Sequence, residues 1–384
     1  MKIAEVKAHL VHTAWRKNWI FVKVETDEGI HGWGEAYTQY DRDRSIAIHV
    51  EELARYLTGR SPFDIKHHTT MAFDDYAKRR GSVEFFSALS AIEQALWDIV
   101  GKANNQPIYN LLGGKYRNRI RVYANGWSYG MTTPKDFAAA AAKAVERGFT
   151  ALKFDPIPSP QWRTYIPRGY ERTAIDVVRE IRSAVGPDVD LLIELHRRLA
   201  PMHAIRLAKR LEEFDPFWLE EPCLATNLDA LESIRATTEI PVVTGEALYT
   251  KADFRPVFEK SAADIINPDV CNVGGILELK EIAAMAEPYF IAVAPHNYNS
   301  TVLGLAATVQ ASVTMQNFLI TEYFLPFEEL GSEVCPNVLQ PERGYLTIPE
   351  APGIGVTIDE KALAKHPFRQ FKERRLPTYE GEAV

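Results

Sequence analysis

The sequence predicts an α/β protein in which a closed parallel β/α barrel follows an N-terminal α+β domain. From residue 120 onward, short apolar segments alternate with segments of helical periodicity. Three of these apolar segments end in a carboxylate, and Glu194, Glu220 and Glu246 recur at equal intervals, as expected of repeated strand and helix units. A chain of 384 residues is also longer than one small core usually organises.

Residues 1–118 have the mixed patterns of an α+β domain. The expected elements are strands at 2–12 and 19–26, turns at 27–29 and 32–35, and helices at 47–57 and 85–104. The segment at 13–18, which holds Trp15 and Arg16, is either a solvated hairpin tip or a flap over the site.

Residues 119–325 form the predicted barrel. Its strands are expected at 120–124, 151–155, 190–195, 217–221, 241–246, 264–268, 291–295 and 318–323. Helices fill the gaps, for example at 200–214 and 275–289. An open doubly wound sheet is the structural alternative, but no G-x-G-x-x-G follows the first strand. In a barrel, the catalytic groups are expected at the C-terminal ends of the strands.

The loop at 156–169 is unusually long for a compact barrel and contains aromatic residues and arginines, so we predict a lid. Arg163 in it has the chemistry to bind a distal carboxylate, and Tyr165 that of a proton donor or acceptor; a surface turn is the alternative. The Pro- and Gly-rich segment at 326–384 is expected to pack back on the N-terminal domain.

Composition excludes several classes of protein. A net charge of −7 with both signs interspersed does not suit nucleic-acid binding. No apolar run reaches the length of a membrane span, and the first residues lack a signal core, so we expect a cytoplasmic protein with no membrane partner. Cys223, Cys271 and Cys335 form no C-x-x-C pair and are expected to be reduced and buried.

A polar residue falls near the C-terminal end of seven of the eight predicted strands. The set is Lys153, Asp155, Glu194, His196, Glu220, Glu221, Glu246, Asp269, His296 and Glu322. Three converging carboxylates suit a hard divalent cation such as Mg²⁺, which could stabilise the dianion formed when a proton leaves the carbon next to a carboxylate. Asp269 and His296 lie on adjacent strand ends, where the carboxylate would fix the histidine tautomer and raise its basicity. Glu322 could hydrogen-bond the substrate if protonated, or form a salt bridge.

Taken together, the segments ALWDIVGK, LLGGKYR, ALKFD, ELH, WLEEP, TGEALY, INPDVCNVGGI, APHN and TEY resemble the enolase superfamily, and within it the mandelate racemase subgroup. The resemblance implies a modified (β/α)₇β TIM barrel with an N-terminal capping domain completed by the C-terminal segment, and an essential Mg²⁺. It implies that Glu194, Glu220 and Glu246 bind the metal. It further implies that Asp269 and His296 form the general base, and that Glu322 contacts substrate.

Two departures from the racemase pattern decide the expected subtype. Racemases of the family have Lys-x-Lys on the second strand, where this chain has Lys153 and then Asp155, which makes a two-base racemisation less expected. His196 stands two residues after the ligand Glu194, as in the family's acid-sugar dehydratases, where it is implied to protonate the departing hydroxyl. Glu194 itself replaces a more usual aspartate.

We therefore expect a Mg²⁺-dependent dehydratase of a sugar acid, an aldarate or aldonate such as galactarate or galactonate. His296 would remove the α-proton, and His196 or Tyr165 would protonate the leaving hydroxyl. The residues expected to contact substrate are Trp15, Arg16, Lys153, Asp155, Arg163 and Glu322. The alternatives are an epimerase or lactone cycloisomerase with Lys153 as the opposite-face acid, and a non-catalytic sugar-acid-binding barrel. The resemblance also implies a homo-oligomer, dimeric or octameric, whereas the sequence leaves open whether Arg197 and Arg198 face the site.

Overall fold

The computed structural model describes residues 1–39, 41–78, 80–157 and 166–371. The chain begins with a three-stranded antiparallel sheet of β1 (Ile3–His12), β2 (Asn18–Thr26) and β3 (His31–Ala36). The helices that follow it are α1 (Asp43–Leu57), α2 (Ile65–Met71), α3 (Val83–Ala103) and α4 (Ile108–Leu111), with a short π-helical segment at Ala72–Tyr76. The predicted N-terminal strands and helices are thus present.

The turn predicted at 32–35 is wrong, because these residues form most of β3. Their glycines serve close packing: a Cβ at Gly32 or Gly34 would collide with the backbone carbonyls of Ala95 and Ala91 in α3. Glycine therefore lets the helix lie directly on the strand, which is a long-range reason that a local turn pattern does not reveal.

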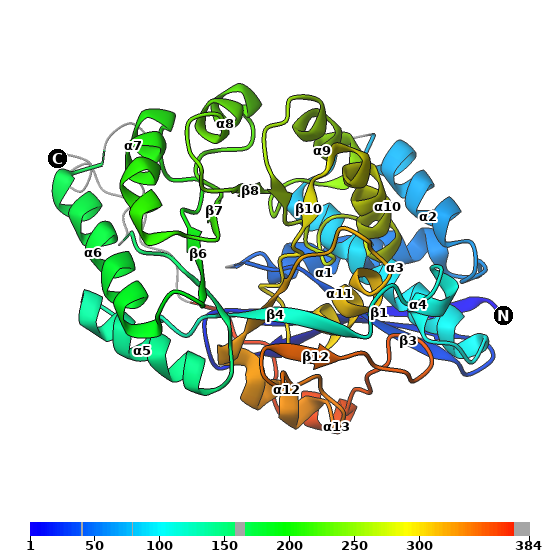
Figure 1. Cartoon of the computed structure of the whole chain (residues 1–384). Coiled ribbons are helices and arrows are strands. Elements are labelled where there is room, and N and C mark those ends of the chain that lie inside the picture. The colour runs from blue at the N-terminus through cyan, green and yellow to red at the C-terminus, as the bar shows by residue number, and fades with distance from the viewer. Residues whose placement is uncertain (40, 79, 158–165, 372–384) are drawn as a thin grey trace.

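The barrel consists of eight parallel strands in the described part of the chain (Figure 1). They are β4 (Arg119–Asn125), β5 (Ala151–Phe154), β6 (Asp190–Glu194), β7 (Trp218–Glu220), β8 (Val242–Thr244), β9 (Ile265–Ile266), β10 (Ala292–Val293) and β11 (Thr321–Phe324). β11 pairs in parallel with β4, and a parallel bridge between Val293 and Phe318 closes the ring. All eight predicted strands are confirmed, most with ends one to three residues shorter than expected.

Helices separate successive strands and form the outer layer of the barrel (Figure 1). They are α5 (Pro134–Glu146), α6 (Arg168–Val185), α7 (Pro201–Leu211), α8 (Leu228–Arg235), α9 (Thr250–Glu259), α10 (Ile276–Ala286) and α11 (Leu303–Ser312). α11 differs from the others because all its residues are buried. This architecture is the modified (β/α)₇β barrel that the sequence predicts. None of the helices in the described ranges is both long and apolar enough to cross a membrane.

Two buried carboxylates of the N-terminal domain cap barrel helices. Glu93 in α3 accepts hydrogen bonds from the backbone N–H groups of Ile276 (2.7 Å) and Leu277 (3.0 Å), at the start of α10. Glu35 in β3 accepts from those of Ser300 (2.8 Å) and Gly304 (2.7 Å), at the start of α11. Carboxylates satisfy the free N–H groups at helix N-termini and complement the helix dipole. These contacts fix the capping domain to the barrel.

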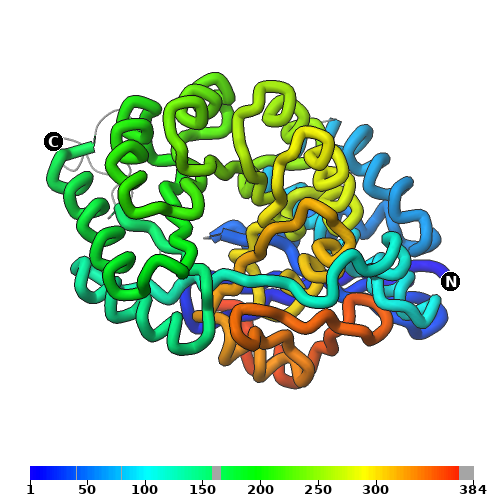
Figure 2. Tube along the Cα trace, in the orientation of Figure 1, coloured from blue at the N-terminus to red at the C-terminus, as the bar shows by residue number. Residues whose placement is uncertain are grey.

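The C-terminal segment joins both parts of the molecule, as predicted. After α12 (Glu328–Val334), β12 (Tyr345–Thr347) pairs antiparallel with β4, and α13 (Glu360–Leu363) follows. The backbone N–H of His12 then donates to the carbonyl of His366, next to a bridge between Val11 and Pro367. In Figure 2 the orange and red C-terminal segment runs beneath β4 toward the blue N-terminal strands.

Candidate active site

Three carboxylates, two of them buried and Glu246 only slightly exposed, meet at the C-terminal ends of β6, β7 and β8. Glu194 and Glu220 are the last residues of their strands and are directly paired in the parallel register, and Glu246 lies two residues beyond β8. One oxygen atom from each lies within 4.8 Å of the others. The predicted ligand set is therefore brought together in a geometry that can hold one metal ion.

The negative charges of two of the three carboxylates, Glu194 and Glu220, are costly in this cluster. Burial and the nearby Glu246 raise the pKa of Glu194 to about 8. Burial also raises the pKa of Glu220 well above its usual value. For Glu246 burial acts in the same direction, but the charges of Arg197 and His296 outweigh it and lower the pKa. Oxygen ligands whose negative charge is this costly fit a hard divalent cation, which would relieve their mutual repulsion.

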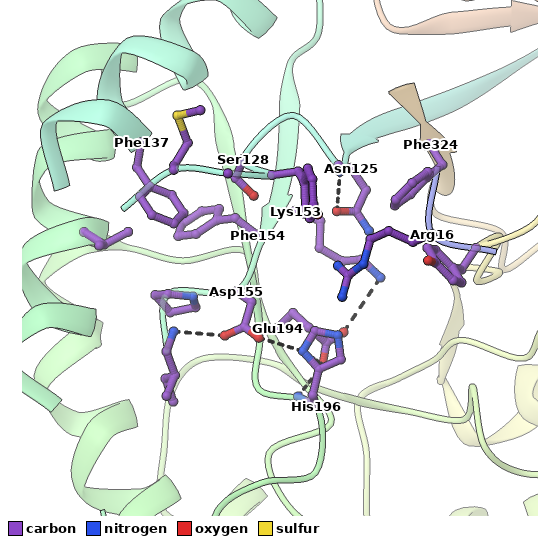
Figure 3. Close-up of a pocket in the computed structure, with 18 of the residues that line it drawn as sticks. Arg16, Asn125, Ser128, Phe137, Lys153, Phe154, Asp155, Glu194, His196 and Phe324 are labelled. Atoms are coloured by element: carbon purple, nitrogen blue, oxygen red, sulfur yellow. Dashed lines mark hydrogen bonds and ion pairs between the residues drawn. The ribbon is translucent and has the colours of Figure 1, made fainter. Parts of the chain in front are cut away.

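Lys153, on β5, lies among the same carboxylates. Its Nζ is 2.8 Å from Oε1 of Glu220, 3.4 Å from Oε1 of Glu322 and 3.8 Å from Oε2 of Glu194. Burial opposes the charged form, but these carboxylates raise the pKa of Lys153 well above its usual value. Lys153 is therefore a fixed cation inside the site (Figure 3).

His296, which follows β10, is paired with Asp269. Its Nδ1 lies 2.7 Å from Oδ2 of Asp269, and Asn299 donates to both oxygens of that carboxylate (2.8 and 2.9 Å). Nε2 lies 3.3 Å from Glu246 and 3.5 Å from Glu322. Burial opposes protonation, but Glu246 and Glu322 together with the bond to Asp269 raise the pKa of His296 to about 9. The predicted Asp and His pair is thus in contact, with Nε2 directed toward the carboxylates.

A second carboxylate and histidine pair lies just after the ends of β5 and β6. Nδ1 of His196 is 2.8 Å from Oδ2 of Asp155, and Arg198 donates to both oxygens of Asp155 at 2.5 Å. Unlike His296, the His196 side chain is about half exposed (47%). Figure 3 shows Asp155, His196 and Glu194 grouped at one side of a cavity.

That cavity has a volume of about 540 Å³ and is lined by both parts of the molecule. Trp15 and Arg16 enter it from the loop between β1 and β2. Trp15 packs against Phe324 and Phe327 with ring centroids 5.2 and 5.6 Å apart, and Lys17 is buried and donates to the carbonyl of Tyr298 (2.5 Å). The loop at 13–18 is therefore packed on the barrel, as in the flap interpretation, and the solvated-tip alternative is wrong.

Most of the predicted site residues line this cavity or lie beside it. Lys153, Asp155, Glu194, His196, Glu246 and His296 line it together with Trp15 and Arg16, while Glu220, Asp269 and Glu322 contact these residues. Arg163 and Tyr165, predicted on a lid, lie outside the described residues. Their roles stay predictions.

Sequence reasoning missed several polar residues that hold the site together. Asn125 ends β4 and donates to Glu322, and Asn267 donates to Glu220 (2.9 Å) one residue after β9. Both lie at the C-terminal end of a predicted strand, where catalytic groups of a barrel are expected, so the same reasoning could have found them. Arg197, which the sequence left open, contacts Glu246 at 2.5 Å.

Comparison with known proteins places the chain in a family. Residues 3–113 match the model of the mandelate racemase/muconate lactonizing enzyme N-terminal domain, and residues 136–362 match the enolase C-terminal domain-like model. A D-gluconate/D-galactonate dehydratase of Picrophilus torridus is 34% identical over 91% of this chain and 89% of its own. A D-galactonate dehydratase of Ralstonia pickettii is 35% identical over 94% of both.

A solved structure agrees with these sequence matches. A Mesorhizobium loti protein, provisionally described as a dehydratase, superimposes with a TM-score of 0.92 at 34% identity, over 96% of this chain and 99% of its own. Two domain models in the expected order, full-length relatives and the fold all agree. The chain therefore belongs to the mandelate racemase/muconate lactonizing enzyme family of the enolase superfamily.

Proposed function

We propose that the protein is a Mg²⁺-dependent dehydratase that converts a sugar acid into a 2-keto-3-deoxy acid. The observation that carries this proposal is that two histidines line one cavity next to the three carboxylates of the candidate metal site. Each histidine has its own carboxylate partner: Asp269 for His296 and Asp155 for His196. A dehydration needs one group to take a proton and another to give one, and this arrangement supplies both.

Glu194, Glu220 and Glu246 would hold the cation. When bound, Mg²⁺ would supply Lewis-acid stabilisation of the negative charge that develops on the substrate carboxylate. Lys153 adds a fixed positive charge beside the same place. A carboxylate is therefore the substrate group that this end of the cavity favours.

The protein's own residues move the protons. Glu246 and Glu322 favour a protonated His296 ring, so Nε2 would act as the base once a bound cation offsets their charge. Nε2 of His296 then takes the proton from the carbon next to the carboxylate, while Asp269 holds the other proton on Nδ1. His196 donates a proton to the hydroxyl on the next carbon, which leaves as water. The enol that results tautomerises to the keto acid. Tyr165 is the other candidate for the proton donor.

The names of the relatives favour an aldonate as substrate. The matched proteins act, by name, on D-gluconate, D-galactonate and D-xylonate. Arg16, which lines the cavity and lies over the ring of Trp15 (5.5 Å), supports an aldarate as the second candidate, because a guanidinium can bind a distal carboxylate. Epimerisation is less well supported, since Lys153, its expected second acid, donates to Glu220 (2.8 Å) and lies among three carboxylates that stabilise its charged form.

The test is an absorbance screen for 2-keto acid formation over a library of aldonic and aldaric acids with Mg²⁺, repeated with EDTA. Product that EDTA abolishes is expected. If no acid gives keto acid but one exchanges its α-proton with deuterated solvent, dehydration is refuted in favour of epimerisation or cycloisomerisation. Binding with neither reaction would favour the non-catalytic alternative. We also propose that the protein is cytoplasmic and forms a homo-oligomer, dimeric or octameric. Mass photometry of the purified protein would measure the size of the assembly.

A further inference from the structure

The two oxygens of Asp155 have different neighbours. Oδ1 accepts from the backbone N–H of Ile157 (2.9 Å) and from Nη2 of Arg198, whereas Oδ2 faces Nδ1 of His196 and the same Nη2. Arg198 is itself buried, 7% exposed, and donates also to the carbonyls of Leu195 and Ile157. An arginine can only donate, so Arg198 fixes Asp155 as an acceptor on both oxygens.

The backbone after β6 is shaped to bring His196 to this carboxylate. His196 and Arg197 both have left-handed φ angles, +48° and +60°, which are uncommon for residues other than glycine. Hydrogen bonds hold this turn: the N–H of His196 donates to Glu194 (2.6 Å) and that of Arg197 to the carbonyl of Glu221 (2.7 Å). A turn that is costly by itself is thus maintained where it places an imidazole in the cavity.

We propose that Asp155 and Arg198 are positioning residues. They hold one proton of His196 on Nδ1 and direct Nε2 into the cavity, so that the proton given to the leaving hydroxyl is a second one, carried on Nε2 of the imidazolium ring. Asp155 then does for His196 what Asp269 does for His296, on another strand end of the same barrel. Asp155 stands where racemases of the family have the second lysine of Lys-x-Lys. In this proposal it acts neither as a base nor as a free substrate ligand. The catalytic consequence rests on the proposed dehydration, but the orientation of His196 does not.

The substitution Asp155→Asn gives a sharp structural test. Oδ1 accepts from two donors, the Ile157 N–H and Nη2 of Arg198, whereas Oδ2 accepts from Nη2 and faces Nδ1 of His196. We therefore expect the amide oxygen to take the Oδ1 position and the NH₂ group to face Nδ1 of His196, with Nη2 of Arg198 moving away from the NH₂ group. Neutral His196 would then carry its proton on Nε2 instead of Nδ1. Solid-state ¹⁵N NMR of the histidine-labelled, Mg²⁺-loaded full chain would show this, with His196→Asn identifying the signal. An unchanged tautomer in Asp155→Asn would overturn the inference.

Turnover gives the second test. In deuterated water, Asp155→Asn should lower dehydration by about 10²-fold, while exchange of the α-proton, which needs His296, stays within about threefold of the wild type. Arg198→Met should have a smaller effect, and the double variant should be no slower than Asp155→Asn alone, because both act through His196. Exchange that falls together with dehydration would refute the positioning role.

A matched control is available at the opposite end of the strands. Arg235 pairs with Asp264 (2.8 Å), just before β9, so Arg235→Met removes a similar ion pair away from the cavity and should change neither rate. If the wild type makes no keto acid from any sugar acid while Asp155→Asn still shifts the tautomer, the dehydration proposal fails and the orientation of His196 by Asp155 stands.

Discussion

Nδ1 of His296 lies 2.7 Å from Oδ2 of Asp269, and this leaves Nε2 as the atom that points toward Glu246 and Glu322. His296→Asn keeps a polar side chain of similar size but removes the group that can accept the α-proton. We expect the dehydration rate to fall by about 10³-fold or more. Steady-state assays would measure the rate, and isothermal titration calorimetry should show that Mg²⁺ still binds. Activity within tenfold of the wild type would refute the assignment of His296 as the base.

The carboxylate of Glu220 is fully buried among the three candidate ligands. Glu220→Gln keeps the shape and an oxygen for Lys153 and Asn267, but it removes one negative charge from the metal site. Mg²⁺ at 100 times its dissociation constant should stabilise the wild type by about 2.7 kcal/mol, and this gain should be largely lost in the variant. Thermal unfolding with and without Mg²⁺ measures it.

The control for that experiment is Glu171→Gln. Glu171 is also a buried carboxylate, but it pairs with Arg206 on the outer helices. Its replacement should leave the stabilisation by Mg²⁺ unchanged. If Glu220→Gln responds to Mg²⁺ as strongly as Glu171→Gln does, the cation binds elsewhere.

Lys153 is surrounded by Glu194, Glu220 and Glu322. Lys153→Met would leave these buried carboxylates without that partner, so we expect the metal-free protein to lose about 3 kcal/mol of stability. Added Mg²⁺ should recover much of this loss, because the cation supplies the missing positive charge. Urea unfolding in EDTA and in Mg²⁺ tests both statements. Equal stability of variant and wild type in EDTA would show that the ammonium group is not needed by the cluster.

The sequence was sufficient for the barrel because parallel strands are buried on both faces and stand out as apolar runs. The carboxylates and histidines at their ends, such as Glu194 and His296, could be predicted together, since the ends of parallel strands meet at one edge. Gly32 and Gly34 were misread because their role depends on α3, some sixty residues later in the chain.

The partners of the site residues could not be predicted in the same way. Asp155 meets His196 and Arg198 only because the chain takes a left-handed turn at residues 196 and 197, and nothing in the local pattern specifies that turn. Lys17 is a similar case. A charged residue in a hairpin loop is normally solvated, and only the packing of this loop against the barrel buries it.

The burial of Lys17 predicts a pH dependence of stability. Burial lowers the pKa of Lys17 to about 8, although Glu35, Asp269, Cys271 and Asp43 act in the opposite direction. The unfolded chain keeps the ordinary lysine value of 10.5, so between about pH 8 and pH 10.5 the unfolded state binds more protons than the folded state. Stability contributed by this residue should therefore rise with pH through that window.

The measurement compares wild type with Lys17→Met, which lacks the titrating group, by chemical denaturation at several values from pH 7 to pH 10.5. The free energy of unfolding of the wild type, measured relative to that of the variant, should increase by up to about 3 kcal/mol as the pH rises over this range. One pKa unit corresponds to about 1.4 kcal/mol. The exposed Lys365, replaced in the same way, serves as the control and should show a constant difference from the wild type. A constant difference for Lys17→Met as well would mean that the folded protein tolerates the buried ammonium without a lowered pKa, and that its bond to the Tyr298 carbonyl compensates for the loss of water.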